Sequence, residues 1–278
     1  SAIRVAVDIP SGLFADQPTG SAVRFISDYC VTFQQPKLCF MWAENKLPHF
    51  EAVNIGLSET AISSSDSEYY YVEKGDVAFK VRGKFSHKGD FGRVLLIAGS
   101  YGKMGAAVLA ARACMRSGAG LLTVHVPQKG YDIVQTTFPE AMCTVSKGDS
   151  YITDLPDTAP YDVIGVGPGI GTDAETAEMI KKLFTTTTKP MVLDADALNI
   201  LSENPDLIPQ IPKGSVLTPH PGEFARLAGK SKNDLEQLDK LKQFAKDHQM
   251  VVVLKGAHTA IATPEGKVFF NSTGNPGM

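Results

Sequence analysis

The sequence predicts an α/β fold in which a mostly parallel sheet is covered by helices on both faces. Two observations support this fold class. Apolar runs of strand length, nearly continuous in Val, Ile and Leu, alternate with helix-length segments through residues 72–278. Polar and glycine-rich clusters follow those runs directly. We therefore predict a three-layer sandwich whose ligand site lies at the carboxyl edge of the strands.

The elements expected in this part follow from the same alternation. The expected strands cover residues 93–98, 121–126, 162–166, 190–194, 215–218 and 250–254, and then a closing pair at 259–262 and 267–270. The expected helices cover residues 104–117, 173–184, 196–202, 221–228 and 233–248. The closing pair is joined by a four-residue turn with Pro264 and Gly266, which is typical of a hairpin.

Residues 1–60 form a separate unit with three expected strands at 3–8, 28–33 and 51–55. Three short strands without a helix cannot bury a core of their own. This unit is therefore expected to pack on the rest or to be the tail of a domain whose first half is absent. The serine-rich residues 61–71 are expected to be a linker, and the alternative is a long surface loop. A chain that starts almost at once in a strand and stops in a glycine-rich loop is expected to be truncated at both ends.

Composition and charge narrow the function classes. The hydrophobic fraction of 43% and the charged fraction of 21% are ordinary for a globular protein. A net charge of −3 without a basic stripe argues against general nucleic-acid binding. The four cysteines lack Cys-x-x-Cys spacing, which favours a reducing compartment. No apolar run approaches the roughly 20 residues of a membrane span and no signal peptide is recognisable, so we expect a cytoplasmic protein.

The stretch from Val94 to Gly105 is an apolar strand, a glycine-bearing turn and the start of a helix rich in small residues. Glycines allow a ligand to approach the backbone, and the N–H groups of a helix N-terminus attract anions. A nucleotide or a phosphorylated substrate is the expected ligand. The turn matches neither the dinucleotide-binding nor the Walker A pattern, so a purely steric role for its glycines stays open.

Four further clusters follow expected strands: Gly165 to Gly171, Asp194 to Asp196, Thr218 to Glu223 and Lys255 to Thr259. Asp194 ends its strand and is expected to face the cleft, whereas Asp196 is expected to cap the next helix. His220 lies between two prolines that fix its backbone, and its alternative is a packing or capping role. Glu223 could serve only the dipole of its helix. Lys255 resembles a phosphate contact, and its alternative is an ordinary lysine at a strand end. No metal-ligand spacing and no Gly-x-Ser-x-Gly elbow are present, which disfavours a metalloenzyme and a serine hydrolase.

Taken together, these residues resemble the NAD(P)H-hydrate dehydratases over nearly all of residues 72–278. The matching stretches are Ser86 to Gly89, Gly92-Arg93, Ile97 to Ser100, Gly105 to Ala107, Arg116 to Gly120, Gly165 to Gly169, Leu193 to Asn199, Leu217 to Glu223 and Leu254 to Gly256. The resemblance implies a ribokinase-like fold and dehydration of the S-epimer of hydrated NADH or NADPH, driven by ADP or ATP. In that reaction the nucleotide phosphorylates a hydroxyl of the substrate, and the phosphate then leaves as the double bond of the ring is restored. Magnesium is expected with the nucleotide, although no ligand for it can be assigned.

The resemblance also implies roles for individual residues. Ala106, Gly169 and His220 match the family's contacts to the hydrated dinucleotide. Asp194 is expected near the same substrate. The nucleotide is expected at Lys255, Gly256, Ala257, His258 and Thr259.

Residues 1–60 resemble the last third of the partner enzyme, the NAD(P)H-hydrate epimerase, which has a Rossmann-like domain. The matching stretches are Val7 to Gly12, Thr32-Phe33, Pro36-Lys37 and Ile55 to Leu57. By this resemblance, Asp8 contacts the hydrated substrate and Ser11 helps to hold a potassium ion. The chain then corresponds to part of a bifunctional repair enzyme in which the two activities are fused.

The sequence departs from the family after Met278, where a Gly-Ser-Gly-Asp turn is expected to supply an anion hole and a general base. We therefore expect poor dehydration by a chain ending there and assign no catalytic residue. Two other functions stay open: a ribokinase-like kinase for a vitamin-precursor alcohol, and a non-catalytic nucleotide-binding or assembly domain. The family tends to form homo-oligomers, although the sequence shows no interface and does not separate ADP from ATP or NADH from NADPH.

Overall fold

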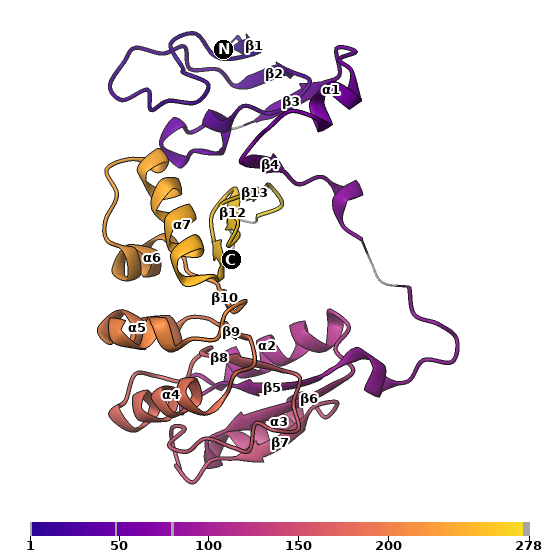
Figure 1. Cartoon of the computed structure of the whole chain (residues 1–278), viewed down its shortest axis with the longest axis vertical. Helices are drawn as coiled ribbons and strands as arrows, with labels where there is room; N and C mark the ends of the chain where they lie inside the picture. Colours follow the sequence, from indigo (N-terminus) through magenta and orange to yellow (C-terminus); the bar gives the residue numbers. More distant parts are fainter. Residues whose placement is uncertain (1, 48, 79–80, 275–278) are drawn as a thin grey trace.

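Two sheets of different size organise the chain in the computed structural model, which describes residues 2–47, 49–78 and 81–274 (Figure 1). The small sheet has three strands in the order β1-β2-β3. The large sheet has ten described strands in the order β4-β13-β12-β11-β10-β9-β8-β5-β6-β7. The large sheet belongs to the part of the chain for which a parallel α/β fold is predicted.

The pairing in the large sheet is mostly parallel, as predicted. The strands are β4 (Tyr69–Tyr71), β5 (Arg93–Ile97), β6 (Leu121–Val126), β7 (Met142–Val145), β8 (Val163–Val166), β9 (Met191–Leu193), β10 (Val216–Leu217), β11 (Val251–Leu254), β12 (Thr259–Ala262) and β13 (Val268–Asn271). Only β12 runs antiparallel, to β11 and to β13, so the expected closing hairpin is confirmed. All the other pairs are parallel, and β5 sits between β6 and β8.

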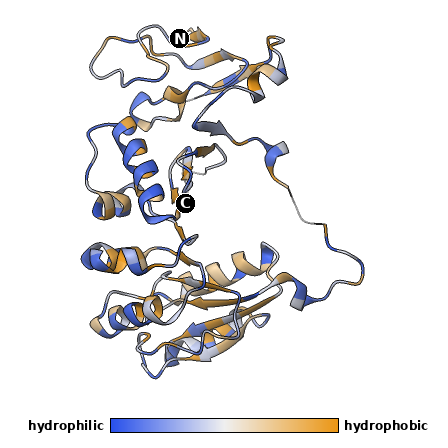
Figure 2. Ribbon diagram, in the orientation of Figure 1, coloured by the Kyte–Doolittle hydropathy of each residue, from blue (hydrophilic) through white to orange (hydrophobic). Residues whose placement is uncertain are grey.

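Helices cover both faces of the sheet, which confirms the three-layer architecture. They are α2 (Met104–Arg116), α3 (Tyr131–Thr137), α4 (Ala174–Thr186), α5 (Asp196–Glu203), α6 (Pro221–Ala228) and α7 (Asp234–His248). Side chains alternate along β5: Leu96 packs in one apolar cluster with α2 and α3, while Leu95 and Ile97 pack in another with α4 to α7. A strand buried on both faces has little room for polar residues, which explains its continuous apolar sequence. Figure 2 shows apolar residues along these strands and mixed faces on the helices.

Local sequence sets the helix ends near the site. Helix α7 begins after Asn233, whose side-chain oxygen accepts a hydrogen bond from the Glu236 N–H at 2.8 Å. It ends at Gln249, which adopts a left-handed conformation with φ 54°. Helix α6 begins with Pro221, whose missing N–H is not needed at a first helical position.

The small sheet is parallel and packs on the larger unit. Its strands are β1 (Val5–Val7), β2 (Tyr29–Phe33) and β3 (Phe50–Val53). A 3₁₀ helix, η1 (Leu38–Met41), buries three residues in a core shared with the large sheet. Phe50 lies 6.3 Å from Tyr71 and 6.0 Å from His258 between ring centroids. The first unit therefore buries apolar surface against the second, one of the two arrangements expected for it.

Some elements were not expected from the sequence. Strand β4 lies in the segment predicted to be a linker, and a short helix, α1 (Glu59–Ser63), precedes it. Helix α3 and strand β7 lie where no element is predicted. The three tyrosines of β4 pair in parallel with β13 at the edge of the large sheet. Tyr70 stacks on Phe269 at 4.9 Å. Cross-strand aromatic pairing therefore outweighs the polar, serine-rich neighbourhood that predicts a linker.

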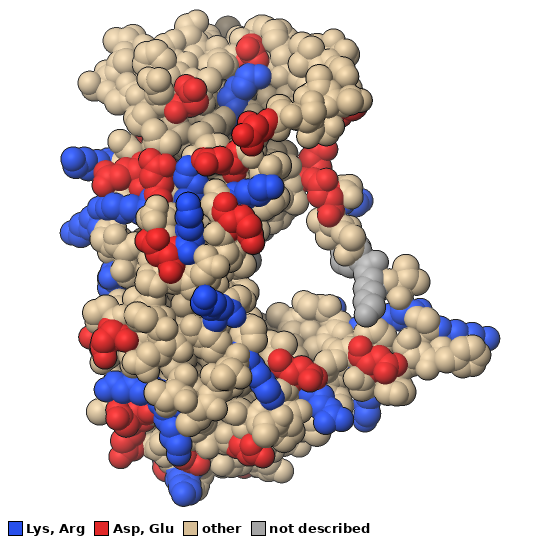
Figure 3. Space-filling model, viewed as in Figure 1, with Lys and Arg blue, Asp and Glu red and all other residues tan. Residues whose placement is uncertain are grey.

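The surface carries both signs of charge. Figure 3 shows Lys and Arg interspersed with Asp and Glu on the face in view, over the region of α6 and α7 as well as the lower sheet. Among the described residues, no helix combines the length and apolar character needed to cross a bilayer.

Candidate functional site at the carboxyl edge of the large sheet

Five neighbouring parallel strands, β5, β8, β9, β10 and β11, end along one edge of the large sheet. Their last residues are Ile97, Val166, Leu193, Leu217 and Leu254, and each predicted polar or glycine-rich cluster follows one of them. The carboxyl ends of parallel strands are where folds of this class bind ligands. The structure therefore brings the clusters to one edge, as predicted.

Two glycine-rich turns pack against each other at this edge. The Gly99 N–H donates to the Pro168 carbonyl at 2.9 Å, and the Ser100 hydroxyl donates to the Gly169 carbonyl at 2.7 Å. A Cβ placed on Gly169 would lie 3.1 Å from the Cβ of Ala106. Ala106, in the first turn of α2, and Gly169, after β8, are both predicted to contact the substrate and are thus neighbours.

Gly167 is required by a close approach of two backbones. A Cβ at this position would lie 1.8 Å from the Asp194 carbonyl oxygen, and its φ is 129°. Both features exclude any other residue without a backbone shift. The next turn is also strained, because Ala195 adopts φ 50° and ψ −117°. This turn sends the side chains of Asp194 and Asp196 to different partners.

Asp194 joins three strand ends. Its Oδ1 accepts hydrogen bonds from the Thr218 hydroxyl at 2.7 Å and from Lys255 Nζ at 2.8 Å. The Asp194 and Lys255 side chains are 33% and 42% exposed, so the pair lies at the surface of the edge. The ammonium of Lys255 thereby has a fixed position with part of its hydrogen-bonding capacity facing solvent.

His220 caps helix α6. Its ring Nδ1 accepts a hydrogen bond from the Gly222 N–H at 3.0 Å, and its backbone N–H donates to Glu223 Oε2 at 2.8 Å. The two bonds form a reciprocal capping box. Because Nδ1 acts as an acceptor, the neutral ring carries its proton on Nε2. The His220 side chain is 52% exposed and Nε2 lies 3.4 Å from Glu223 Oε1. The structure therefore shows the capping alternative for His220, with Glu223 as its capping-box partner and the half-exposed ring beside the Glu223 carboxylate.

The expectation that Asp196 caps α5 is wrong. Ala195 is the N-cap and Asp196 is the first helical residue. Its Oδ2 accepts from the Gly171 N–H at 2.9 Å and from Lys103 Nζ at 3.3 Å. The carboxylate therefore holds the glycine loop after β8 instead of the start of its own helix.

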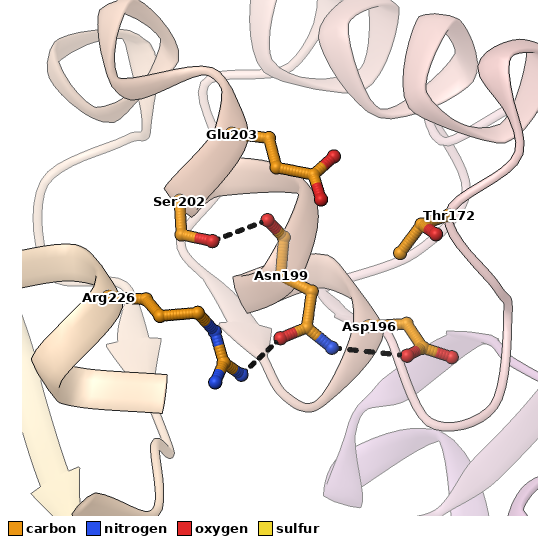
Figure 4. Close-up of a pocket in the computed structure, with 6 residues that line it drawn as sticks. All are labelled: Thr172, Asp196, Asn199, Ser202, Glu203 and Arg226. Atoms are coloured by element: carbon orange, nitrogen blue, oxygen red, sulfur yellow. Dashed lines mark hydrogen bonds between the residues drawn. The ribbon is translucent and has the colours of Figure 1, made fainter. Parts of the chain in front are cut away.

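A pocket of about 520 Å³ opens beside this carboxylate (Figure 4). Its lining residues are Thr172, Asp196, Asn199, Ser202, Glu203 and Arg226. Asn199 Oδ1 accepts from Arg226 Nη2 at 2.6 Å, and Asn199 Nδ2 donates to Asp196 Oδ1 at 3.3 Å. These bonds connect α6, α5 and the glycine loop. The predicted site residues do not include Asn199 or Arg226: Asn199 ends a matching stretch in which it is assigned no role, and Arg226 lies outside the matching stretches.

The stretch predicted to bind the nucleotide follows β11. Gly256 and Ala257 are exposed, and the Thr259 hydroxyl donates to the Gly256 carbonyl at 3.3 Å. A Cβ on Gly274 would lie 2.9 Å from the Gly256 carbonyl oxygen, so the chain returns to this turn before residues 275–278, which lie outside the described residues. The Nδ1 of His258 is buried without a hydrogen-bond partner among the described residues, and burial lowers the pKa of this imidazole.

Asp8 and Ser11 lie in the first unit, away from this edge. Asp8 has φ 62°, and its Oδ1 accepts from the Thr32 hydroxyl and the Phe33 N–H, each at 3.2 Å. Lys37 Nζ lies 3.2 Å from the same oxygen. Burial opposes ionisation, but these hydrogen bonds and the Lys37 charge outweigh it and lower the pKa of Asp8. Ser11 is exposed, and its carbonyl accepts from the Phe25 N–H at 2.8 Å.

The described side chains do not form a metal site made by the protein alone. Within residues 2–47, 49–78 and 81–274, no three His, Cys, Asp or Glu side chains are grouped so that they could hold an ion. A magnesium ion arriving with nucleotide phosphates needs only one or two protein oxygens.

The sequence profile of the family described as NAD(P)H-hydrate dehydratase matches residues 94–278. A curated relative from Moorella thermoacetica, a bifunctional NAD(P)H-hydrate repair enzyme Nnr, is 35% identical over 288 residues, which cover 99% of this chain and 54% of the relative. The Escherichia coli enzyme of the same name is 35% identical over 279 residues, with 99% and 53% covered. The chain thus spans about half the length of these curated relatives.

Two solved structures share the fold. An ADP/ATP-dependent NAD(P)H-hydrate dehydratase from Bacillus subtilis, co-crystallised with ATP and Mg²⁺, superposes with a TM-score of 0.60 at 34% identity, covering 71% of this chain and 69% of its own. A ribokinase-like superfamily protein from Enterococcus faecalis superposes with a TM-score of 0.63 at 28% identity, covering 77% and 75%. The predicted ribokinase-like architecture is therefore confirmed.

Proposed function

This chain belongs to the NAD(P)H-hydrate dehydratase family, and we propose that it dehydrates the S-epimer of hydrated NADH or NADPH at the expense of ADP or ATP. The observation that carries the proposal is the meeting of five strand ends at one edge. Glycine turns for close approach, the His220 ring N–H and the Lys255 ammonium lie there together.

The proposed division of labour follows the geometry. The substrate lies along Ala106, Gly169 and His220, where bare backbone and the His220 Nε2–H offer contacts to hydroxyl or amide groups. The nucleotide lies along Lys255 to Thr259, with the Lys255 ammonium facing its phosphates and magnesium bound through those phosphates. Transfer of a phosphoryl group to the substrate hydroxyl turns a poor leaving group into a good one, and phosphate departs as the ring double bond forms.

In this scheme Asp194 is a positioning residue. Its carboxylate is shared by Thr218 and Lys255, so its contact with the substrate, expected from the sequence, passes through the Lys255 ammonium. A positioning role through Lys255 and a direct contact with the substrate predict different effects on binding when Asp194 is replaced. Loss of the carboxylate should affect nucleotide binding more than substrate binding.

The first unit is proposed to be the C-terminal part of an epimerase domain. Residues 61–71 are proposed to join it to the dehydratase part, and the last three of them form strand β4 of the large sheet. Its Asp8 is held ionised by Thr32, Phe33 and Lys37, which suits a carboxylate that contacts the hydrated nicotinamide. Ser11 is proposed as one potassium ligand. The whole chain is proposed to act in the cytoplasm as a homo-oligomer.

The test is the recovery of NADH absorbance from S-hydrated NADH with ADP, with ATP and with neither, by a chain that includes the Gly-Ser-Gly-Asp turn expected after Met278. The proposal predicts recovery with a nucleotide and none without. Recovery at the same rate in all three samples would contradict nucleotide dependence. Absence of recovery with a chain that carries this turn and still binds ADP would overturn the dehydratase assignment. Phosphorylation of a vitamin-precursor alcohol would then point to a ribokinase-like kinase, a fold shared by the Enterococcus faecalis protein.

A further inference from the structure

The pocket lined by Asp196, Asn199 and Arg226 has no assigned ligand. It holds about 520 Å³, and three more residues complete its lining: Thr172, Ser202 and Glu203. The proposed contacts Ala106, Gly169 and His220 are not among its lining residues. Three contacts account for only part of a dinucleotide, so the rest of the substrate must lie on a neighbouring surface.

The pocket adjoins the proposed substrate contacts on both sides. On one side, Asp196 accepts from the Gly171 N–H and Lys103, and Lys103 in turn borders Gly169. On the other side, Arg226 Nη1 lies 3.9 Å from a Cβ placed on Gly222, two residues after His220. The pocket therefore extends the surface along which the substrate is proposed to lie.

Arg226 is placed to present a charged fork to this pocket. Figure 4 shows its side chain extending from α6 toward Asn199, whose Oδ1 accepts from Nη2 at 2.6 Å. Among the described residues, no carboxylate oxygen lies within 4.0 Å of this guanidinium. A guanidinium has five N–H donors, so a bond to one amide oxygen orients it and leaves donors for a ligand anion.

The remaining polar groups suit a sugar. The Glu203 carboxylate and the hydroxyls of Thr172 and Ser202 line the same pocket, although the Ser202 hydroxyl donates to the Asn199 carbonyl at 2.7 Å. In dinucleotide sites of the Rossmann fold, an acidic side chain binds the ribose 2′-hydroxyl of NAD and an arginine accommodates the 2′-phosphate of NADP, and the same chemistry applies to any pocket that holds this ribose. Both residue types occur in this pocket.

We propose that this pocket binds the ribose of the adenosine end of the substrate, with Arg226 contacting the 2′-phosphate of the NADPH form and Glu203 accepting a hydrogen bond from the 2′-hydroxyl of the NADH form. The proposal rests on the proposed function, because it assigns a part of the same substrate. It makes Arg226 and Glu203 specificity-determining residues with opposite effects.

The test measures binding of NADPH and NADH to the full chain by calorimetry, so it does not depend on turnover. Arg226→Gln is expected to weaken NADPH binding about tenfold and NADH binding less than about twofold, because only the former loses a charge-assisted hydrogen bond. Glu203→Gln is expected to weaken NADH binding a few-fold, by about the worth of one hydrogen bond, and to leave NADPH binding unchanged or tighter. Arg226→Lys should restore part of the NADPH affinity, and Lys182→Gln, on the exposed side of α4, should change neither.

The outcomes separate this inference from the proposed function. Equal weakening of both dinucleotides by Arg226→Gln would place the guanidinium on the pyrophosphate and overturn the 2′-phosphate assignment, as would unchanged binding of both. Thermal unfolding of each variant shows whether it is folded, and the Arg226→Lys variant carries the test if Arg226→Gln is not. A folded wild-type chain that binds neither dinucleotide, nor dehydrates the hydrated forms, would instead contradict the proposed function.

Discussion

Lys255 Nζ lies 2.8 Å from Asp194 Oδ1, so an ion pair joins the ends of β11 and β9 across the end of β10. Thr218, at the end of β10, donates to the same oxygen at 2.7 Å. Because both charged side chains are partly exposed, the pair contributes little to stability by itself. The ion pair instead fixes the position of the Lys255 ammonium at the edge proposed to bind the nucleotide phosphates.

Replacement of Lys255 by Gln is expected to weaken ADP binding about tenfold, the usual worth of one charge-assisted hydrogen bond to a phosphate. Calorimetric titration with ADP measures the change. Lys242→Gln is the matched control, because Lys242 forms a 2.9 Å ion pair with Glu68 away from the strand ends. Equal ADP affinities for the two variants would show that Lys255 is a structural residue only.

Substitution of Gly167 by Ala is expected to destabilise the fold by about 3 kcal/mol or more, since the added Cβ would meet the Asp194 carbonyl oxygen at 1.8 Å. Gly266→Ala is the control for backbone strain alone, because Gly266 has φ 83° and no neighbour within 4 Å of the added Cβ. It should lose only about 1–2 kcal/mol. Urea denaturation measures both, and similar losses would contradict a steric requirement at Gly167.

The large sheet could be predicted because its strands are buried on both faces. Leu95 and Ile97 pack on one side and Leu96 on the other, so β5 has to be apolar at every position, and such a run is visible in the sequence. The parallel order then places Gly99, Gly167, Asp194, His220 and Lys255 at one edge without further information.

Other features depend on contacts that a single sequence does not show. Tyr69 to Tyr71 become a strand only because β13 offers an edge, and their polar neighbours predict a linker. Asp196 looks like a helix cap, but the Gly171 N–H and Lys103 compete for its oxygens. The role of Arg226 in the pocket depends on Asn199, 27 positions earlier in the chain. A single sequence thus does not show which distant residues a surface side chain contacts.

His220→Asn separates capping from substrate contact. Asn is a favourable N-cap residue, so the variant should keep helix α6 and lose less than about 1 kcal/mol of stability. It removes the ring N–H, and binding of NADPH is expected to weaken about fivefold, by the worth of one hydrogen bond.

His87→Asn is the matched control for His220. His87 caps the 3₁₀ helix η4 (Lys88–Phe91) by the same bonds, with Nδ1 accepting from the Gly89 N–H at 3.1 Å and Asp90 completing the capping box. Its ring lies before β5, at the opposite end of the strands from the site. NADPH affinity that falls alike in both variants, or in neither, would contradict a substrate contact by His220.

The buried His125 predicts a loss of stability in mild acid. Its ring nitrogens lie 3.0 Å from the Thr144 hydroxyl and 3.2 Å from the Asp154 carbonyl, and burial lowers its pKa although the Asp154 carbonyl acts in the opposite direction. The unfolded chain, with an ordinary histidine pKa of about 6.5, then binds more protons than the folded chain once the pH falls below that value. The free energy of unfolding should therefore decrease as the pH is lowered from about 7.5 to 5.5.

The His125→Gln variant tests this prediction. It removes the titration of His125, while His258, whose pKa burial also lowers, still titrates. Urea denaturation at the two pH values should show a smaller decrease for the variant, and an equal decrease would mean that His125 is protonated in the folded protein as readily as in the unfolded chain.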